Sequence, residues 1–175
     1  MKKIFLIAIV FFTTITSCKS FNFQLKEPIV IDSLDCPENG TCNFELIPNK
    51  SIEFKSDEFG NLYPVISDGD TTLFKYTFQK KPLKDTQDSN YTEIIYAELP
   101  AKISELSLAN ETLQNIKLYF GRLCYCKGAT GYYPIKNGVF TISKTSKDCV
   151  TFKVDFKITE VPQIISTIQQ TVSLK

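Results

Sequence analysis

Apolar and polar residues alternate along most of the chain beyond residue 28, and turn-forming residues separate the alternating runs. The clearest run covers residues 149–159, and its apolar positions are Val150, Phe152, Val154, Phe156 and Ile158. A period of two is typical of a β-strand that buries one face. This run therefore predicts an amphipathic strand that packs on a core.

Shorter runs with the same period predict further strands, at residues 29–31, 42–47, 51–55, 62–66, 71–79, 91–99, 116–126, 132–135, 139–143 and 163–174. Clusters of Gly, Pro, Asn and Asp predict turns at 48–50, 58–61 and 67–70. Residues 80–90 are polar and predict a loop, and residues 101–113 favour β structure over a short helix. Asn137-Gly138 predicts a tight hairpin between residues 132–135 and 139–143, because this dipeptide tolerates the positive φ of such turns.

These patterns predict an all-β fold, a single antiparallel β-sandwich or partly open barrel of about ten short strands. The composition agrees, since 43% of residues are hydrophobic and 13% are aromatic. Aromatic side chains pack well on pleated surfaces. We found no internal repeat and no change of composition, so residues 29–175 are expected to form one domain.

The first residues have the layout of an export signal. Lys2 and Lys3 precede an apolar run at 4–12, and small or hydroxyl residues lead to Cys18. The apolar run is too short to span a bilayer as a helix, which needs about 20 residues. Residues 1–17 are therefore predicted to be a cleaved signal peptide.

The segment Ile15-Thr16-Ser17-Cys18 resembles the lipobox of bacterial lipoproteins. In that family the cysteine is acylated, with fatty acids such as palmitate, and becomes the new N-terminus. The resemblance implies that Cys18 holds the protein on the lipid bilayer, with residues 18–28 as a lipidated tether. It also implies a place in the cell envelope, on the periplasmic face of the outer membrane or on the cell surface.

Export permits disulfides, and five cysteines remain once Cys18 is set aside. Cys36 and Cys42 bracket a turn-like segment and are expected to pair. Cys124 and Cys126 lie two apart in an extended segment, so their side chains share one face. The expected second disulfide joins Cys149 to Cys124 or Cys126 and leaves the other thiol unpaired.

The candidate chemistry is sparse because the chain contains no histidine. This removes the usual general base and the commonest metal ligand. The thiols of Cys124, Cys126 and Cys149 would suit Cu(I) or zinc, but oxidation to a disulfide is favoured, and no metal or cofactor is expected. Acidic pairs occur at 57–58 and at 68 and 70, where turn capping is the simpler role.

A loop with two glycines and two aromatic residues is the strongest candidate for binding. Its residues are Lys127, Gly128, Gly131, Tyr132 and Tyr133. Alternation along a strand sends Tyr132 and Tyr133 to opposite faces, so at most one belongs to a binding platform.

Two tripeptides resemble the acceptor pattern of the general O-glycosylation system of Bacteroidota. They are Asp32-Ser33-Leu34 and Asp70-Thr71-Thr72, which makes Ser33 and Thr71 the candidate acceptors.

The expected function is that of a membrane-anchored envelope lipoprotein acting as a non-catalytic binding or interaction module with an envelope protein as partner. An inhibitor or immunity-type protein that blocks a toxin or protease is the alternative, and a hydrolase with paired carboxylates is less favoured. Nucleic acid is not an expected partner, because 20 Lys and Arg residues are balanced by 19 Asp and Glu residues.

Overall fold

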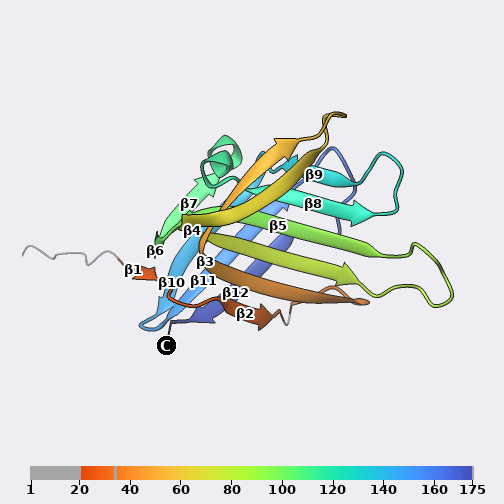
Figure 1. Cartoon of the computed structure of the whole chain (residues 1–175). Helices are drawn as coiled ribbons and strands as arrows, with labels where there is room; N and C mark the ends of the chain where they lie inside the picture. Colours follow the sequence, from red (N-terminus) through yellow and green to blue (C-terminus); the bar gives the residue numbers. More distant parts are fainter. Residues whose placement is uncertain (1–20, 34, 175) are drawn as a thin grey trace, which may run out of the picture.

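Two antiparallel sheets face each other in the computed structural model, which describes residues 21–33 and 35–174 (Figure 1). The larger sheet has the order β2 (Ile29–Asp32), β3 (Gly40–Ser56), β4 (Leu62–Lys80), β5 (Tyr91–Pro100), β8 (Tyr119–Cys124) and β9 (Gly131–Pro134). The smaller sheet has the order β12 (Thr167–Ser173), β11 (Cys149–Lys157), β10 (Asn137–Ser146) and β7 (Leu106–Ala109). β1 (Asn22–Gln24) pairs with β6 (Lys102–Ser104), and the 3-10 helix η1 (Asn110–Ile116) follows β7. The prediction of an all-β sandwich is confirmed.

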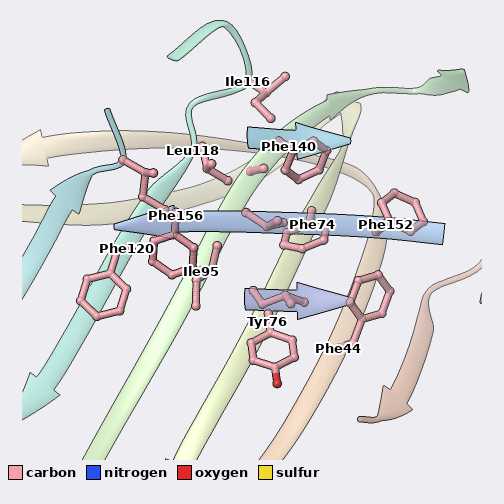
Figure 2. Packing of buried hydrophobic residues seen from close by; sticks show 14 of the residues in the cluster. Phe44, Phe74, Tyr76, Ile95, Ile116, Leu118, Phe120, Phe140, Phe152 and Phe156 are labelled. Carbon is pink, nitrogen blue, oxygen red and sulfur yellow. The ribbon is translucent and has the colours of Figure 1, made fainter. Parts of the chain in front are cut away.

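The main core lies between the two sheets and is built from aromatic contacts across the gap (Figure 2). Phe74 of β4 meets Phe140 of β10 edge to face, with ring centres 5.4 Å apart. Phe120 of β8 lies 5.9 Å from Phe156 of β11, and Phe44 of β3 lies 5.6 Å from Phe152 of β11. Full burial of one such side chain contributes about 1.5–3 kcal/mol. The alternation in β11 thus gives the inward face that its sequence predicts.

β3 and β4 are longer than predicted, because they form one hairpin that bends instead of ending. The turns predicted at 48–50 and 67–70 are wrong: Lys50 lies opposite Asp68 within the β3–β4 ladder. The register shifts between Pro48 and Lys50, where Asn49 has a φ of 57°. Such a bulge bends a strand without ending its pairing. The predicted turn at 58–61 is present at the hairpin tip.

The part of this hairpin beyond the bend, residues 50–67, is the hairpin arm, and it folds over the outer face of the larger sheet (Figure 1). Phe54 of the arm stacks on Tyr119 with ring centres 3.7 Å apart. The amide of Ile52 donates to Glu98 Oε2 (2.7 Å), and its carbonyl accepts from Lys117 Nζ (2.9 Å). A second apolar cluster lies beneath the arm and contains Ile52, Leu73, Ile94 and Tyr96.

The hairpin predicted at Asn137-Gly138 is also wrong, since β9 and β10 belong to different sheets. The chain crosses between the sheets here, and Ile135 is fully buried at the crossing. A β-carbon at Gly138 would lie 2.3 Å from the Asp155 carbonyl oxygen. The glycine therefore allows β10 and β11 to approach closely, a role that the dipeptide pattern does not distinguish from a turn.

Part of the predicted tether is ordered structure. β1 occupies residues 22–24, and Phe21, Phe23 and Leu25 pack against the main core. These three side chains are half-buried, so the segment packs against the domain although polar residues separate its apolar positions. The predicted signal peptide and Cys18 lie outside the described residues. Within the described ranges, no helix has the length and apolar character needed to cross a bilayer.

The sandwich has two ends with different contents (Figure 1). We call the end that holds β1, the β10–β11 turn and the end of β12 the proximal end. We call the opposite end, which holds the loops 81–90, 125–130 and 158–166, the distal end. The distal end carries the loop that the sequence marks as a binding candidate.

Candidate functional site

The distal end displays one aromatic side chain on a covalently closed loop. β8 ends at Cys124, and a disulfide joins Cys124 to Cys126 across Tyr125. The Tyr125 side chain is 83% exposed. The ring closure holds the backbone on both sides of this tyrosine, so the aromatic group is presented in a restricted set of directions.

This disulfide corrects the predicted pairing of Cys149 with Cys124 or Cys126. Cys149 is the one free cysteine among the described residues. β8 runs toward the distal end, whereas β11 begins at the proximal end, so Cys149 lies at the far end of the sandwich from Cys124 (Figure 1). The predicted Cys36–Cys42 disulfide is confirmed.

An open hollow of about 340 Å³ lies beside Tyr125. Its walls come from the β4–β5 loop and from the ends of β5 and β8: Asp88, Asn90, Thr92, Leu123, Cys124 and Tyr125. Leu123 is 36% exposed and forms part of this wall. The hollow therefore combines an apolar side, formed by Leu123 and Tyr125, with the carboxylate of Asp88.

The side chain of Arg122, in β8 just before the loop 125–130, is buried and contacts this loop. Its Nη1 donates to the Ala129 carbonyl (2.9 Å), and its Nε donates to the Tyr91 hydroxyl (3.2 Å). The guanidinium also lies 5.2 Å from the centre of the Tyr91 ring. The Arg122 carbonyl accepts from Thr130 Oγ1 (3.1 Å). The C-terminal end of the loop, at Ala129 and Thr130, is thus tied to one residue of β8.

The polar chain continues from Tyr91 to a buried carboxylate. The Tyr91 hydroxyl donates to Glu93, whose side chain is completely buried. Glu93 also accepts the amides of Ile164 (2.6 Å) and Ile165 (2.7 Å) in the segment before β12. Buried carboxylates need such donors, because unpaired burial of charge is costly. Glu93 therefore fastens the loop 158–166 to the larger sheet.

Burial is the main cause that raises the pKa of Tyr91 to about 12, and its hydrogen bond to Glu93 acts in the same direction. Arg122 opposes this rise through its own hydrogen bond and charge. At neutral pH the Tyr91 hydroxyl is therefore protonated and donates to the carboxylate. This protonation state keeps the chain from Arg122 to the Ile164 amide intact.

The predicted binding loop is divided between exposed and packed residues. Lys127 and Gly128 are exposed at its tip. Gly131, Tyr132 and Tyr133 line a cleft of about 240 Å³ that the arm tip closes on its other side, at Gly60, Asn61 and Leu62.

The two tyrosines of this loop point to opposite faces of β9, as predicted. Tyr132 packs against the cluster beneath the arm, and Tyr133 packs against the main core. Gly121 lies opposite Tyr132 in the β8–β9 ladder, and a β-carbon there would be 2.5 Å from the ring. Burial raises the pKa of Tyr132. Both rings serve mainly as packing, and Tyr125 is the exposed aromatic residue of the segment that joins β8 to β9.

One acid of each acidic pair, Asp57 and Asp68, has local partners. The amides of Phe59 and Asn61 donate to Asp57 Oδ1, at 2.9 and 2.7 Å. The Asn61 side-chain amide is the main cause that lowers the pKa of Asp57. Asp68 forms an ion pair with Lys50 at 2.6 Å, and the hydrogen bond in that pair lowers the pKa of Asp68. Asp57 caps the turn at the arm tip, the role expected from its sequence context, whereas Asp68 pairs with a side chain across the β3–β4 ladder and caps no turn.

The two candidate glycosylation residues are half-buried. Thr71 Oγ1 donates to the Lys50 carbonyl (2.7 Å) at the bend of the long hairpin. Ser33 follows β2 and forms a hydrogen bond with Tyr76, whose pKa is raised chiefly by burial. The structure thus engages both hydroxyl groups in contacts within the domain, and their modification stays a prediction.

Sequence reasoning missed Tyr125, Arg122 and Glu93. A residue between two cysteines of a C-x-C segment is a signal for Tyr125, because a disulfide of that span forces the middle residue outward. Arg122 and Glu93 break the apolar alternation of their strands at inward positions, which marks them as buried polar residues. Comparison with protein-family models, with curated proteins and with solved structures gave no match for this chain.

Proposed function

We propose that this protein is a lipid-anchored lipoprotein of the bacterial cell envelope and a non-catalytic binding module whose distal end recognises another envelope protein. The observation that carries the proposal is the exposure of Tyr125, at 83%, on a disulfide-closed loop. Tyrosine is enriched among the residues that dominate protein–protein binding energies.

The support beneath the loop favours a recognition role. Ordering a flexible loop on binding costs about 0.5–1.5 kcal/mol for each immobilised side chain. The Cys124–Cys126 disulfide and the bonds from Arg122 to Ala129 and Tyr91 order this loop in advance. A partner that covers Tyr125 and Leu123 would therefore gain apolar contact with little loss of conformational entropy.

The placement of the termini suits a membrane anchor. The described chain begins at Phe21, which packs beside the proximal end. The lipobox-like segment that ends at Cys18 precedes it by three residues. Attachment of Cys18 to a bilayer would direct the distal end, with Tyr125, away from the lipid surface. Two or three acyl chains give stable anchoring, whereas one gives marginal binding.

The use of the acidic groups supports a non-catalytic role. The carboxylate of Glu93 accepts backbone amides in the interior, and Asp57 and Asp68 accept bonds from local donors. A pair of acids in a hydrolase must instead face a shared substrate site. We therefore favour a binding function over a hydrolase function for this protein.

The anchor is tested with the Cys18→Ser variant, expressed from its own signal and followed by membrane fractionation. We expect the wild-type protein in the membrane fraction and the variant in the soluble periplasmic fraction. Recovery of the variant wholly in the membrane fraction would contradict the anchor.

The recognition surface is tested by purifying the wild-type protein and the Tyr125→Ala variant from solubilised envelopes. We expect a stoichiometric envelope protein with the wild type and its loss with the variant, because the variant removes the exposed ring. Lys153→Ala on the outer face of β11 is the control and should retain the partner. Equal recovery with Tyr125→Ala would refute this surface. A toxin or protease as the recovered partner would instead favour the inhibitor function.

A further inference from the structure

β12 forms the free edge of the smaller sheet, because β11 is its neighbour on one side and no described strand pairs with the other. The amide of Leu174 donates to the Asp148 carbonyl (2.8 Å), and the Ser166 carbonyl accepts from Phe156 (2.9 Å). Backbone groups alternate in direction along an antiparallel strand. Even-numbered residues thus bond to β11, and the outward backbone groups belong to Thr167, Gln169, Thr171 and Ser173.

This edge lacks the features that usually protect edge strands. β12 contains no charged residue and no proline, and its register with β11 is unbroken over seven pairs. Native edges are commonly short, charged, bulged or covered. The other outermost strands of the two sheets fit that rule, since β2, β7 and β9 have four residues each and β9 ends at Pro134. One outward group is already used, because the Gln170 side chain donates to the Thr171 carbonyl (3.1 Å).

A groove of about 380 Å³ runs between β12 and the start of the β2–β3 connection. Its lining is Ile31, Asp32, Ser33, Asp35, Gln169, Gln170 and Thr171. The lining includes two acids and no base, and both acids are exposed. Asp32 accepts only a long bond of 3.5 Å from the Asn43 side-chain amide. The groove therefore presents negative charge beside unpaired backbone groups.

We propose that the β12 edge binds an extended strand of another protein, which continues the smaller sheet and places a basic side chain against Asp32 and Asp35. Main-chain bonds to the outward groups of β12 would supply affinity, and the acids would supply the preference for lysine or arginine. A second copy of this chain fits poorly as the occupant, because its β12 has no basic residue to offer. The surface is separate from Tyr125 and does not depend on the distal recognition site.

The test uses the mature full-length domain and two short blocked peptides of alternating threonine and valine, one with a central lysine and one with a central glutamate. Amide shifts and hydrogen exchange are recorded by NMR during titration. We expect the lysine peptide to shift and protect the amides of Gln169 and Thr171. The glutamate peptide should bind about tenfold more weakly, because the acids of the groove repel it. Asp32→Asn combined with Asp35→Asn should bring the two affinities within about twofold.

Two β12 variants separate the edge from the fold. Gln169→Pro removes an outward amide, which an edge strand tolerates, and should abolish peptide binding while the domain stays folded. Gln169→Lys keeps the outward amide and should weaken binding of the lysine peptide, because the two positive charges repel each other. This variant replaces Gln169→Pro in the test if the proline variant fails to fold. Tyr125→Ala should bind both peptides as the wild type does, which distinguishes this site from the distal one. The proposal is overturned if the lysine peptide leaves the β12 amides unchanged at millimolar concentration, or if it binds Gln169→Pro and Gln169→Lys like the wild type.

Discussion

The guanidinium of Arg122 lies 5.2 Å from the centre of the Tyr91 ring and donates to its hydroxyl. This contact joins β8 to β5 directly below the loop that carries Tyr125. Arg122 also holds the Ala129 carbonyl, so one side chain links the core of the larger sheet to the distal loop. The position of the exposed Tyr125 thus depends on the hydrogen-bonded chain that runs from the buried Glu93 through Tyr91 to Arg122.

We expect Arg122→Leu to lower the free energy of unfolding by about 2 kcal/mol, because hydrogen bonds from a charged group contribute about 1.5–3 kcal/mol. The variant should also speed hydrogen exchange at residues 129–131, since the Ala129 carbonyl loses its donor. Urea unfolding and exchange mass spectrometry measure the two effects. Lys127→Ala, in the exposed tip of the same loop, is the control and should change stability by less than about 0.5 kcal/mol. Unchanged exchange at 129–131 in Arg122→Leu would show that the polar chain does not order the loop.

The hairpin arm offers a test of its own. Phe54→Ala removes the ring that stacks on Tyr119 at 3.7 Å and leaves a gap over the outer cluster. We expect a loss of about 2 kcal/mol in the free energy of unfolding, below the range for a fully buried phenylalanine, because Phe54 is half-buried. Exchange should rise across residues 50–67 as the arm loosens.

Phe59→Ala is the matched control for the arm, because Phe59 is on the same hairpin and is 80% exposed. Its stability should stay within about 0.5 kcal/mol of the wild type. Similar losses in both variants would mean that the arm does not pack on the sheet as described.

The sequence could predict the strands of the core but not how the long hairpin bends. The period of two in β11 follows directly from one buried and one exposed face, so its prediction was confirmed. The bend at Asn49 depends on a register shift between two strands, and a turn signal on each strand alone indicates an end. Asn137-Gly138 was misleading for a similar reason, since its glycine permits a close approach to Asp155 and not a hairpin.

The candidate site was predicted only in part. The glycine and tyrosine content marked the loop, but it could not show that Tyr132 and Tyr133 are packed by segments distant in the sequence. The expected pairing of Cys149 with Cys124 or Cys126 assumes that both of these cysteines stay in a regular strand. β8 ends at Cys124, and this frees the backbone to turn and bring the two sulfur atoms together.

Cysteine mapping tests that connectivity. Non-reducing digestion of the unfolded domain should yield Cys36 linked to Cys42 and Cys124 linked to Cys126. Alkylation before reduction should label Cys149 alone among the described cysteines. A peptide that joins Cys149 to either cysteine of the distal loop would contradict the structure.

Alkaline pH should destabilise the domain through two tyrosines, the buried Tyr96 and the half-buried Tyr91. Burial, followed by the charges of Tyr132 and Glu45, raises the pKa of Tyr96 to about 12, and Tyr91 is raised to about 12 as well. In the unfolded chain each tyrosine ionises near its ordinary pKa of 10.0, whereas in the folded domain it stays protonated up to about pH 12. The contribution of each tyrosine to stability is therefore complete below pH 10 and is lost as the pH rises from 10 toward 12. Urea unfolding between pH 8 and 11 should show this decline in the wild type. The free energy of unfolding should fall less with pH in Tyr91→Phe and in Tyr96→Phe. If both variants lose stability with pH as steeply as the wild type does, the tyrosines are not the cause.

The most direct test of the central claim is site-specific photo-crosslinking in living cells, with a photoreactive phenylalanine analogue at position 125. Recognition through the distal loop predicts one discrete crosslinked species that contains an envelope protein. The same species should weaken when Cys124→Ser and Cys126→Ser open the loop, and it should be absent when the analogue replaces the exposed Lys153 instead. No crosslinked species at position 125, or the same species from position 153, would contradict the distal end as the recognition surface.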